Sequence, residues 1–474
     1  MPTAFEEVLA IRGRGTPDAE EIAITGADPV FSTKFKIGET CAAVLGGVGA
    51  AVNDVWELKT GQRQRVSIDV RHAAGALRST TYLQRPGADG TFQPVVNENH
   101  EKMIKITQPW PTKDGRWVLP HFGLANLQAR MLELLNCEPT PESVSAAVSK
   151  WTAIDLEDAI DKARVCGGMV RTNQEWLASE HGQVLAGKPI VEVIKIGDSE
   201  PEPLPPGDRP LSGIRALDLT RILAGPICAR TLAEHGADVL MVTAERLPQI
   251  AEHVIDTNHG KRSCFLDLKK PEQAARLKDL VKDADVFSQG YRPHMIADLG
   301  FGPEELASIR PGLIYTSISC YGADGPLSHR GGWEQVAQTM TGICHEGSPE
   351  RPALLPAAAC DYTTGYLAAY GILLALARRA KEGGSYHVRV SLCQSGMFIY
   401  RQGSVAFDRP NMDLGAEELD TLRIETRPTF GPIRHLGPVL RLSETPARWE
   451  RPTPVLGGNR PEWLPGGTAT RAAE

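Results

Sequence analysis

Between residues 211 and 320 the chain alternates short apolar runs with amphipathic stretches of helical length. Five runs have strand character and lie at 214–219, 239–242, 264–268, 286–287 and 313–318. Stretches 227–235 and 271–282 have the apolar spacing of helices. Strands that alternate with such helices predict a parallel sheet covered by helices on both faces. We therefore expect an α/β fold with a large Rossmann-like parallel-sheet domain plus a smaller α/β domain.

A helix, a glycine turn and an alternating strand occur twice in the sequence. Segment 38–70 aligns with segment 360–392 without a gap, and Glu39 falls where Asp361 stands. The period is too long for a solenoid repeat, so we interpret it as a partial internal duplication. The glycines at 46, 47 and 49 do not have GxGxxG spacing and follow no strand, which favours close helix packing over a dinucleotide loop.

Composition divides the chain further. Residues 197–212 hold five prolines and read as an extended linker. We predict six segments: an irregular N-terminal segment 1–30, a helix–strand segment 31–75 completing the large domain, a small domain 76–200, a linker 201–212, a large domain 213–400, and a segment 401–474 that returns to the large domain. The tryptophans at 110, 117, 151 and 176 are expected to pack in the small domain.

Charge and cysteine usage exclude several classes of protein. The formal charge of −7 argues against a nucleic-acid partner. Nine scattered cysteines without a CxxC pair predict neither a metal site nor disulfides and fit a cytoplasmic protein. The N-terminus has no signal pattern, and the longest apolar run, 42–52, is too short to cross a membrane. We expect a cytoplasmic protein with no membrane partner.

Asp361 lies at the mouth of a loop, just ahead of an apolar helix expected at 362–381. Gly383 and Gly384 end that helix, and 387–392 alternates as a strand. Two interpretations of the carboxylate stay open from local sequence. It can cap the helix by accepting first-turn amides. It can also be a nucleophile, ionised at the positive helix end.

Several motifs from residue 211 onward occur together in one order. They are IRALDLTRILAGP at 214–226, HGADVLMV at 235–242, NHGKRSCFLDLK at 258–269, YRP at 291–293, GLIYTSISCYGADGP at 312–326 and the helix of Asp361. In order and spacing they resemble the class III CoA-transferases of the CaiB/BaiF type. The resemblance implies an enzyme that moves CoA between an acyl-CoA and a free carboxylic acid through an aspartyl-CoA intermediate. Asp361 would be the nucleophile, and Glu334 would help to hold the geometry of the site.

The same resemblance assigns the CoA contacts. Lys261 and Arg262 match the basic pair beside the nucleotide, and Arg292 and Arg221 match two further cations. Backbone N–H groups of Ala224 and Gly225 can meet an anion or thioester at a helix start, and Gly325, Gly331 and Gly332 can admit close approach. CoA would be a co-substrate, with no permanently bound cofactor and no metal, and the protein would be a homodimer.

The chain also departs from the family pattern. The stretch TAERLPQIAEH, 243–253, replaces an acidic run on the adenine side, and the small domain comes from the N-terminal half of the chain. Whether the two halves complement each other within one chain or across a dimer is open. Two other functions stay open: an acyl-CoA racemase, although Trp333–Glu334 replaces the His–Asp pair of the racemases, and a CoA-binding member without catalysis.

Overall fold

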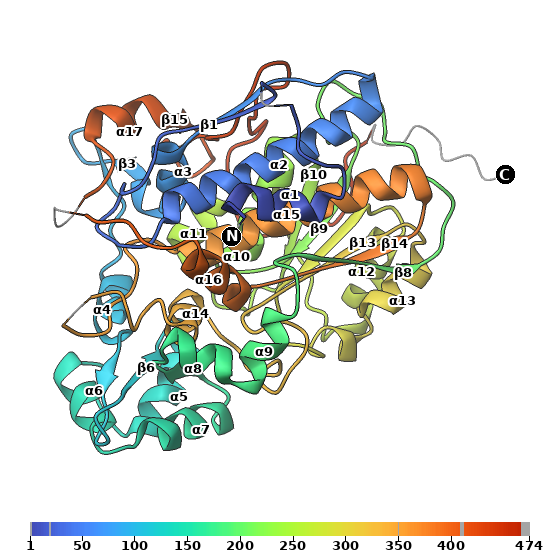
Figure 1. The fold of residues 1–474 in the computed structure, drawn as a ribbon. Coiled ribbons are helices and arrows are strands. Elements are labelled where there is room, and N and C mark those ends of the chain that lie inside the picture. The colour runs from blue at the N-terminus through green and yellow to red at the C-terminus, as the bar shows by residue number, and fades with distance from the viewer. Residues whose placement is uncertain (1, 19, 349, 408–411, 466–474) are drawn as a thin grey trace.

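The computed structural model describes residues 2–18, 20–348, 350–407 and 412–465. A seven-stranded sheet forms its centre, in the order β11-β10-β9-β12-β13-β14-β8 (Figure 1). The strands are β8 (Glu192–Gly197), β9 (Arg215–Leu219), β10 (Asp238–Thr243), β11 (Arg262–Phe265), β12 (Val286–Gln289), β13 (Ile314–Ser319) and β14 (Ser385–Ser391). All neighbouring pairs are parallel except β14 and β8. The predicted α/β fold with a large parallel sheet is therefore confirmed.

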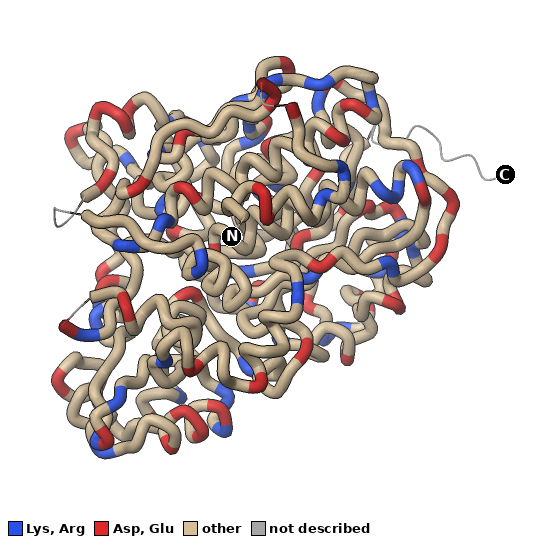
Figure 2. Tube along the Cα trace, in the orientation of Figure 1, with Lys and Arg blue, Asp and Glu red and all other residues tan. Residues whose placement is uncertain are grey.

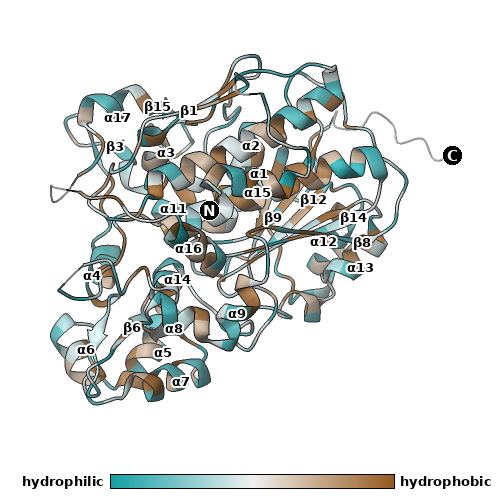
Figure 3. Ribbon diagram, in the orientation of Figure 1, coloured by the Kyte–Doolittle hydropathy of each residue, from teal (hydrophilic) through white to brown (hydrophobic). Residues whose placement is uncertain are grey.

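Successive residues on each strand point to opposite faces of this sheet and enter two separate cores. Ala216 and Val286 join the core beneath α10 (Ala224–Glu234), α15 (Ala359–Glu382) and α2 (Ile37–Thr60). Leu217 and Phe287 join the core beneath α12 (Pro271–Val281) and α13 (Pro303–Ile309). Figure 3 shows apolar residues concentrated along β9, β12 and β14. Burial on both faces explains why these strands read as continuous apolar runs.

The internal repeat is present in three dimensions. Helices α2 and α15 both have 24 residues, and their N-cap residues have nearly the same backbone angles, φ −78° and ψ 60° at Lys36 and φ −81° and ψ 57° at Ala358. Strand β2 (Val66–Asp69) is followed directly by α3 (Val70–Ala76), as β14 is by α16 (Leu392–Arg401). Figure 1 shows α2 and α15 running side by side. The repeat thus covers one helix more than the sequence indicated.

Glycines in α2 serve close packing, as predicted. A Cβ at Gly47 would lie 2.3 Å from Cγ1 of Val8, and one at Gly49 would lie 2.5 Å from Cγ1 of Val66. The strand of this first copy differs from expectation, because β2 does not enter the large sheet. It lies between β1 (Ile22–Thr25) and β17 (Arg441–Leu442) in a three-stranded sheet of its own.

The small unit has a separate core. Strands β5 (Trp110–Pro111), β6 (Trp117–His121) and β7 (Cys166–Met169) form its sheet. Its helices are α4 (Glu98–Ile106), α5 (Ala125–Leu135), α6 (Pro141–Val148) and α7 (Ala153–Lys162). Helices α8 (Asn173–Ala178) and α9 (Glu180–Ala186) lead from it to β8. Trp110 and Trp151 pack against this core as expected, whereas Trp176 is fully buried in the core of the large unit.

Two segments differ from the sequence-based division. Residues 1–30 are not irregular, because α1 (Ala4–Arg12) and β1 lie there and Val8 and Leu9 are buried. Strand β8 was assigned to the small domain but hydrogen-bonds to β14 in the large sheet. The apolar residues of α1 are buried against α2, which lies outside the immediate sequence, so local composition did not predict this helix.

The C-terminal segment adds small elements before it reaches the large sheet again. Helix α17 (Ala416–Leu422) precedes β15 (Arg423–Thr426) and β16 (Ile433–Leu436). These strands join β3 (Gln84–Pro86) and β4 (Phe92–Pro94) in a four-stranded sheet. Further on, the N–H of Asn459 donates to the carbonyl of Ser263 on β11. Positions 408–411 and 466–474 of the predicted segment lie outside the described residues.

The remaining elements are short. They are the 3₁₀ turns η1 (Ser79–Tyr82) and η2 (Ala297–Leu299), and helices α11 (Ala251–Thr257) and α14 (Glu334–Thr341). Lysine and arginine are interspersed with aspartate and glutamate along the trace in the view of Figure 2. Among the described helices, none combines the length and apolar character needed to cross a bilayer.

Candidate active site

A cavity of about 440 Å³ opens at the carboxyl end of the parallel strands. The chain leaves β9 in one direction to β10 and β11, and the order reverses at the neighbouring β12. Residues that follow β9, β12 and β13 line the cavity: Thr220–Gly225, Gly290–Pro293 and Cys320. In open α/β sheets, ligands bind outside the carboxyl ends of strands where the order reverses. The cavity therefore occupies the position that this topology favours for a ligand.

The small unit supplies the opposite wall. Leu124, Leu127 and Arg130 on and before α5 face the cavity, together with Arg164 and Cys166 at the start of β7. Residues of the small unit and of the large unit therefore line a single cavity. No motif marks these small-domain residues, because their relation to the large sheet arises only from tertiary packing.

Asp361 lines the cavity from the first turn of α15. Asp361 is 7% exposed. The helix begins two residues earlier, at Ala359, with Ala358 as the N-cap. The side chain is not the N-cap, so the capping interpretation is wrong. Position N3 places the backbone N–H at the positive end of a 24-residue helix and directs the carboxylate into the cavity.

Glu334 takes over the capping of α15. Its Oε2 accepts the N–H of Asp361 at 2.5 Å, and its Oε1 accepts the N–H of Cys360 at 3.1 Å. Gln338 donates from Nε2 to the same Oε1 at 2.6 Å and accepts the N–H of Leu355 at 2.8 Å. Glu334 does not line the cavity. It is a buried carboxylate that holds the backbone of Asp361 in place.

The two carboxylates perturb each other. Burial, and then the charge of Glu334, raise the pKa of Asp361 well above its ordinary value. Burial also raises the pKa of Glu334, while its hydrogen bonds to Gln338 and to the two amides act in the opposite direction. A carboxyl with a raised pKa in a cavity is typical of a reactive group.

The first copy of the repeat preserves this geometry. Asp28 accepts the N–H of Glu39 through Oδ2 at 2.8 Å, as Glu334 does for Asp361. The carboxylate of Glu39, however, pairs with Lys36 at 3.2 Å and is about one third exposed. It does not line the cavity that holds Asp361.

The N-terminus of α10 forms the wall beside Asp361. Ala224 and Gly225 are its first two residues, both line the cavity, and no side chain among the described residues caps them. A Cβ at Gly365 would lie only 2.4 Å from the carbonyl oxygen of Ala224. Gly365 is one turn beyond Asp361 on α15, so this close approach brings the start of α10 next to the carboxylate.

Several arginines surround the apolar part of the cavity. Arg221 and Arg292, for which the resemblance implied CoA contacts, line it. Arg221 donates to the carbonyl of Pro248, and Arg292 donates to the carbonyl of Arg164 at 3.1 Å. Three more arginines, not found from the sequence, are Arg130, Arg164 and Arg330. Gly331 and Gly332 also line it, whereas Gly325 packs against His181 elsewhere.

Lys261 and Arg262 differ from expectation. Lys261 is fully buried and pairs with Asp218 at 2.8 Å, and Arg262 pairs with Asp238 at 2.8 Å. Neither lines the cavity. Their charges are used by internal carboxylates, so we assign them structural partners in place of the CoA contact that the motif suggested.

Comparison with known proteins agrees with the motifs. Residues 211–413 match CoA-transferase family III. An acetyl-coenzyme A transferase of Hypoxylon pulicicidum is 31% identical over 417 residues, which cover 79% of this chain and 70% of that protein. The human succinyl-CoA:glutarate CoA-transferase is 34% identical over 205 residues, 40% of this chain and 46% of that protein.

A solved structure of a CAIB/BAIF family protein from Brucella suis is 28% identical and covers 48% of this chain and 65% of that one, with a TM-score of 0.38. The match of the Hypoxylon pulicicidum relative extends into both halves of the chain and through most of that relative's own length. The chain therefore belongs to CoA-transferase family III and is a transferase.

Proposed function

We propose that the protein transfers CoA from an acyl-CoA to a free carboxylic acid, with Asp361 as the nucleophile. One observation carries the proposal: a buried carboxylate lies in a ligand-sized cavity, with its backbone held by Glu334 and the uncapped start of α10 beside it. Family membership supplies the reaction class.

The chemistry follows from the carboxylate. An oxygen of Asp361 attacks the thioester carbonyl, the C–S bond breaks, and a mixed anhydride and CoA thiolate form. The thiolate then attacks the carbonyl of Asp361, which gives an aspartyl-CoA thioester and releases the first acid. The carboxylate of the second acid attacks this thioester, the C–S bond breaks, and a second mixed anhydride and CoA thiolate form. The thiolate then attacks the acyl carbonyl of this anhydride, which gives the new acyl-CoA and restores the carboxylate of Asp361. Each attack develops an oxyanion, for which the N–H groups of Ala224 and Gly225 are suitable donors.

CoA would be a co-substrate, and the cavity offers cations for its phosphates. Arg221 and Arg292 line the cavity and, within the described residues, form no ion pair with a carboxylate. Guanidinium groups bind phosphate through paired donors. We therefore retain Arg221, Arg292, Ala224 and Gly225 as the binding residues and Asp361 as the reactive group, with Glu334 as the residue that positions it.

The racemase alternative needs a base partner near Asp361. No histidine occurs among the described residues that line the cavity. His329 pairs with Asp161 on the small domain, and Trp333 stacks on His121 at 4.6 Å between ring centres. The buried pair of Asp361 and Glu334 also argues against a member that has lost its catalytic group.

A substrate panel tests the function. Acetyl-CoA and succinyl-CoA are suitable donors, and glutarate is a suitable acceptor, because relatives carry names with these groups. We expect a new acyl-CoA by mass spectrometry and an acylated or CoA-bearing Asp361 after trapping. Exchange of the α-proton without CoA transfer would instead support the racemase. A homodimer and a cytoplasmic location stay predictions, for which sedimentation and cell fractionation are the tests.

A further inference from the structure

The loop between β9 and α10 has an unusual backbone where it lines the cavity. Ile222 has φ +75°, a left-handed conformation that β-branched residues rarely adopt. Leu223 follows with φ −140° and ψ −66°, and then α10 begins. Such conformations persist only where surrounding contacts determine them, and they gather at functional sites.

Lys261 hydrogen-bonds to residues at both ends of this loop. Its Nζ donates to Oδ2 of Asp218 at 2.8 Å and to the carbonyl of Pro226 at 2.9 Å. Asp218 accepts the N–H of Thr220 through its other oxygen at 3.0 Å. A single buried ammonium therefore joins the end of β9 to the first turn of α10.

Packing leaves the loop little room to move. A Cβ at Gly225 would lie 2.2–2.5 Å from the side-chain atoms of Thr220. Thr220 is in turn held by Asp218 through both its N–H and its hydroxyl. On the other side, α10 lies against Gly365 of the catalytic helix. The position of the Ala224 and Gly225 amides relative to Asp361 thus depends on one connected set of contacts.

We propose that Lys261 is a positioning residue for the transfer reaction: it clamps the loop between Asp218 and Pro226, so that the amides of Ala224 and Gly225 face the reacting carbonyl at Asp361. This inference rests on the proposed function for its catalytic consequence. It assigns Lys261 a role different from the nucleotide contact suggested by its motif. An arginine or an apolar residue at position 261 would not reproduce the two hydrogen bonds that this buried ammonium donates to Asp218 and Pro226.

Two variants separate the clamp from general stability. Lys261→Met removes the ammonium and leaves Asp218 as an unpaired buried charge, which can itself impair folding. The double variant Lys261→Met/Asp218→Asn is neutral, and its asparagine can still accept the N–H of Thr220. The double variant therefore has no unpaired buried charge, but it still lacks the hydrogen bond from position 261 to the carbonyl of Pro226.

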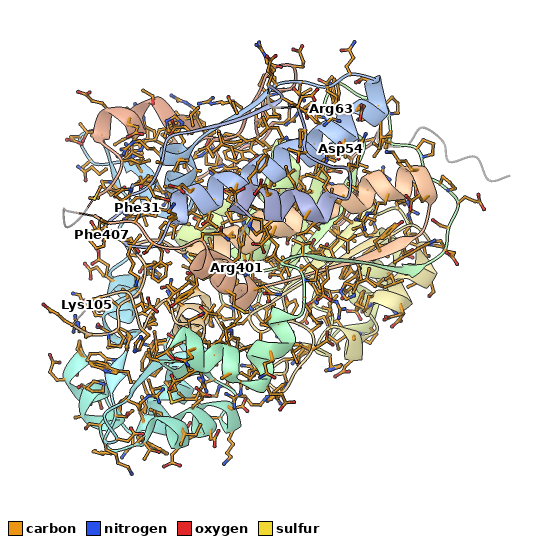
Figure 4. The ribbon with its side chains drawn as sticks, viewed as in Figure 1. Phe31, Asp54, Arg63, Lys105, Arg401 and Phe407 are labelled. Carbon is orange, nitrogen blue, oxygen red and sulfur yellow. The ribbon has the colours of Figure 1, made fainter. Side chains whose placement is uncertain are left out.

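A matched control is the buried pair of Arg12 and Asp54, with side-chain exposures of 4% and 2%. Asp54 is labelled on α2 in Figure 4, far from the small domain that walls the cavity. Arg12→Met also removes a buried cation from a buried carboxylate and should cost stability without touching the loop, although Asp54 keeps Arg14 and Arg63 as partners. All variants are measured as full-length folded protein.

The first measurement is hydrogen exchange of peptides that span 219–227. Both Lys261 variants should exchange there about tenfold faster than wild type, and Arg12→Met should not. The second is steady-state transfer: kcat should fall about 100-fold in both variants, the size expected when oxyanion donors are displaced, while KM for acyl-CoA stays within about threefold.

Unchanged exchange in the folded double variant would overturn the clamp. Faster exchange with kcat within about twofold of wild type would overturn the positioning role. The exchange measurement needs no substrate. If wild type proves unable to transfer CoA, the proposed function fails, and exchange still decides whether Lys261 holds the loop.

Discussion

Oε2 of Glu334 accepts the backbone N–H of Asp361 at 2.5 Å, so one carboxylate fixes the main chain of the residue that presents the other. The contact joins the first residue of α14 to the first turn of α15, 27 positions later in the chain. Holding a nucleophile through its backbone leaves its side chain directed at the cavity. It also brings two buried carboxylates together, with consequences for activity, pH dependence and stability.

Asp361→Asn should abolish transfer and leave the fold intact. An amide cannot form the anhydride, so kcat should fall by roughly a thousandfold or more. Mass spectrometry after hydroxylamine trapping should find the adduct on Asp361 in wild type and none in the variant. Transfer close to the wild-type rate would remove the proposed mechanism.

The same variant should not lose stability at neutral pH. Because the pKa of Asp361 is raised in the folded protein, ionising it costs stability as pH rises through that pKa. Below the unfolded pKa the carboxyl is protonated in both states and this cost is absent. Thermal unfolding of Asp361→Asn should therefore match or exceed wild type at pH 8 and show no gain at acid pH. A lower midpoint at pH 8 would contradict this assignment of the cost.

Glu334→Gln should shift the pH dependence of the reaction. The charge of Glu334 raises the pKa of Asp361, so its removal should lower that pKa and move the acid limb of the kcat/KM profile to lower pH. The rate should also fall, because a glutamine offers one acceptor oxygen for two amides. An acid limb at the wild-type position, with the fold intact, would show that the two carboxylates are not coupled in solution.

Arg292→Ala and Arg221→Ala should each weaken CoA binding. Each loss should be about 1–3 kcal/mol, the value of a charged hydrogen bond. Calorimetric titration with CoA measures it, and Arg276→Ala, an exposed arginine on α12 outside the cavity, serves as the control. Equal affinity in all four proteins would place the CoA phosphates elsewhere.

Glu39→Gln should leave turnover within about threefold of wild type, although Glu39 occupies the position of Asp361 in the repeat. Its carboxylate pairs with Lys36 and does not reach the cavity. Trapping should yield one adduct per chain. A loss as large as that of Asp361→Asn would mean that both copies of the repeat react.

Local sequence predicted much of the large unit. The apolar runs of β9 and β12 indicate buried strands, because both faces of the central sheet are covered. The apolar residues that follow Asp361 recur at the spacing of a helix, which indicates α15. Motif order supplied the family, and the alignment of 38–70 with 360–392 supplied the repeat. Each of these features depends on the order of residues within one continuous segment of the chain.

Contacts between distant segments were beyond the reach of the sequence. Arg130 and Arg164 reach the cavity only because the small unit packs over the end of the sheet. Strand β8 pairs with β14, although the two strands are far apart in the sequence. Lys261 was expected at the surface of a nucleotide site, yet Asp218, 43 positions earlier, pairs with it inside the protein. A motif specifies which residues are present, but burial and ion pairing depend on which other segments come near them, and only the tertiary structure decides that.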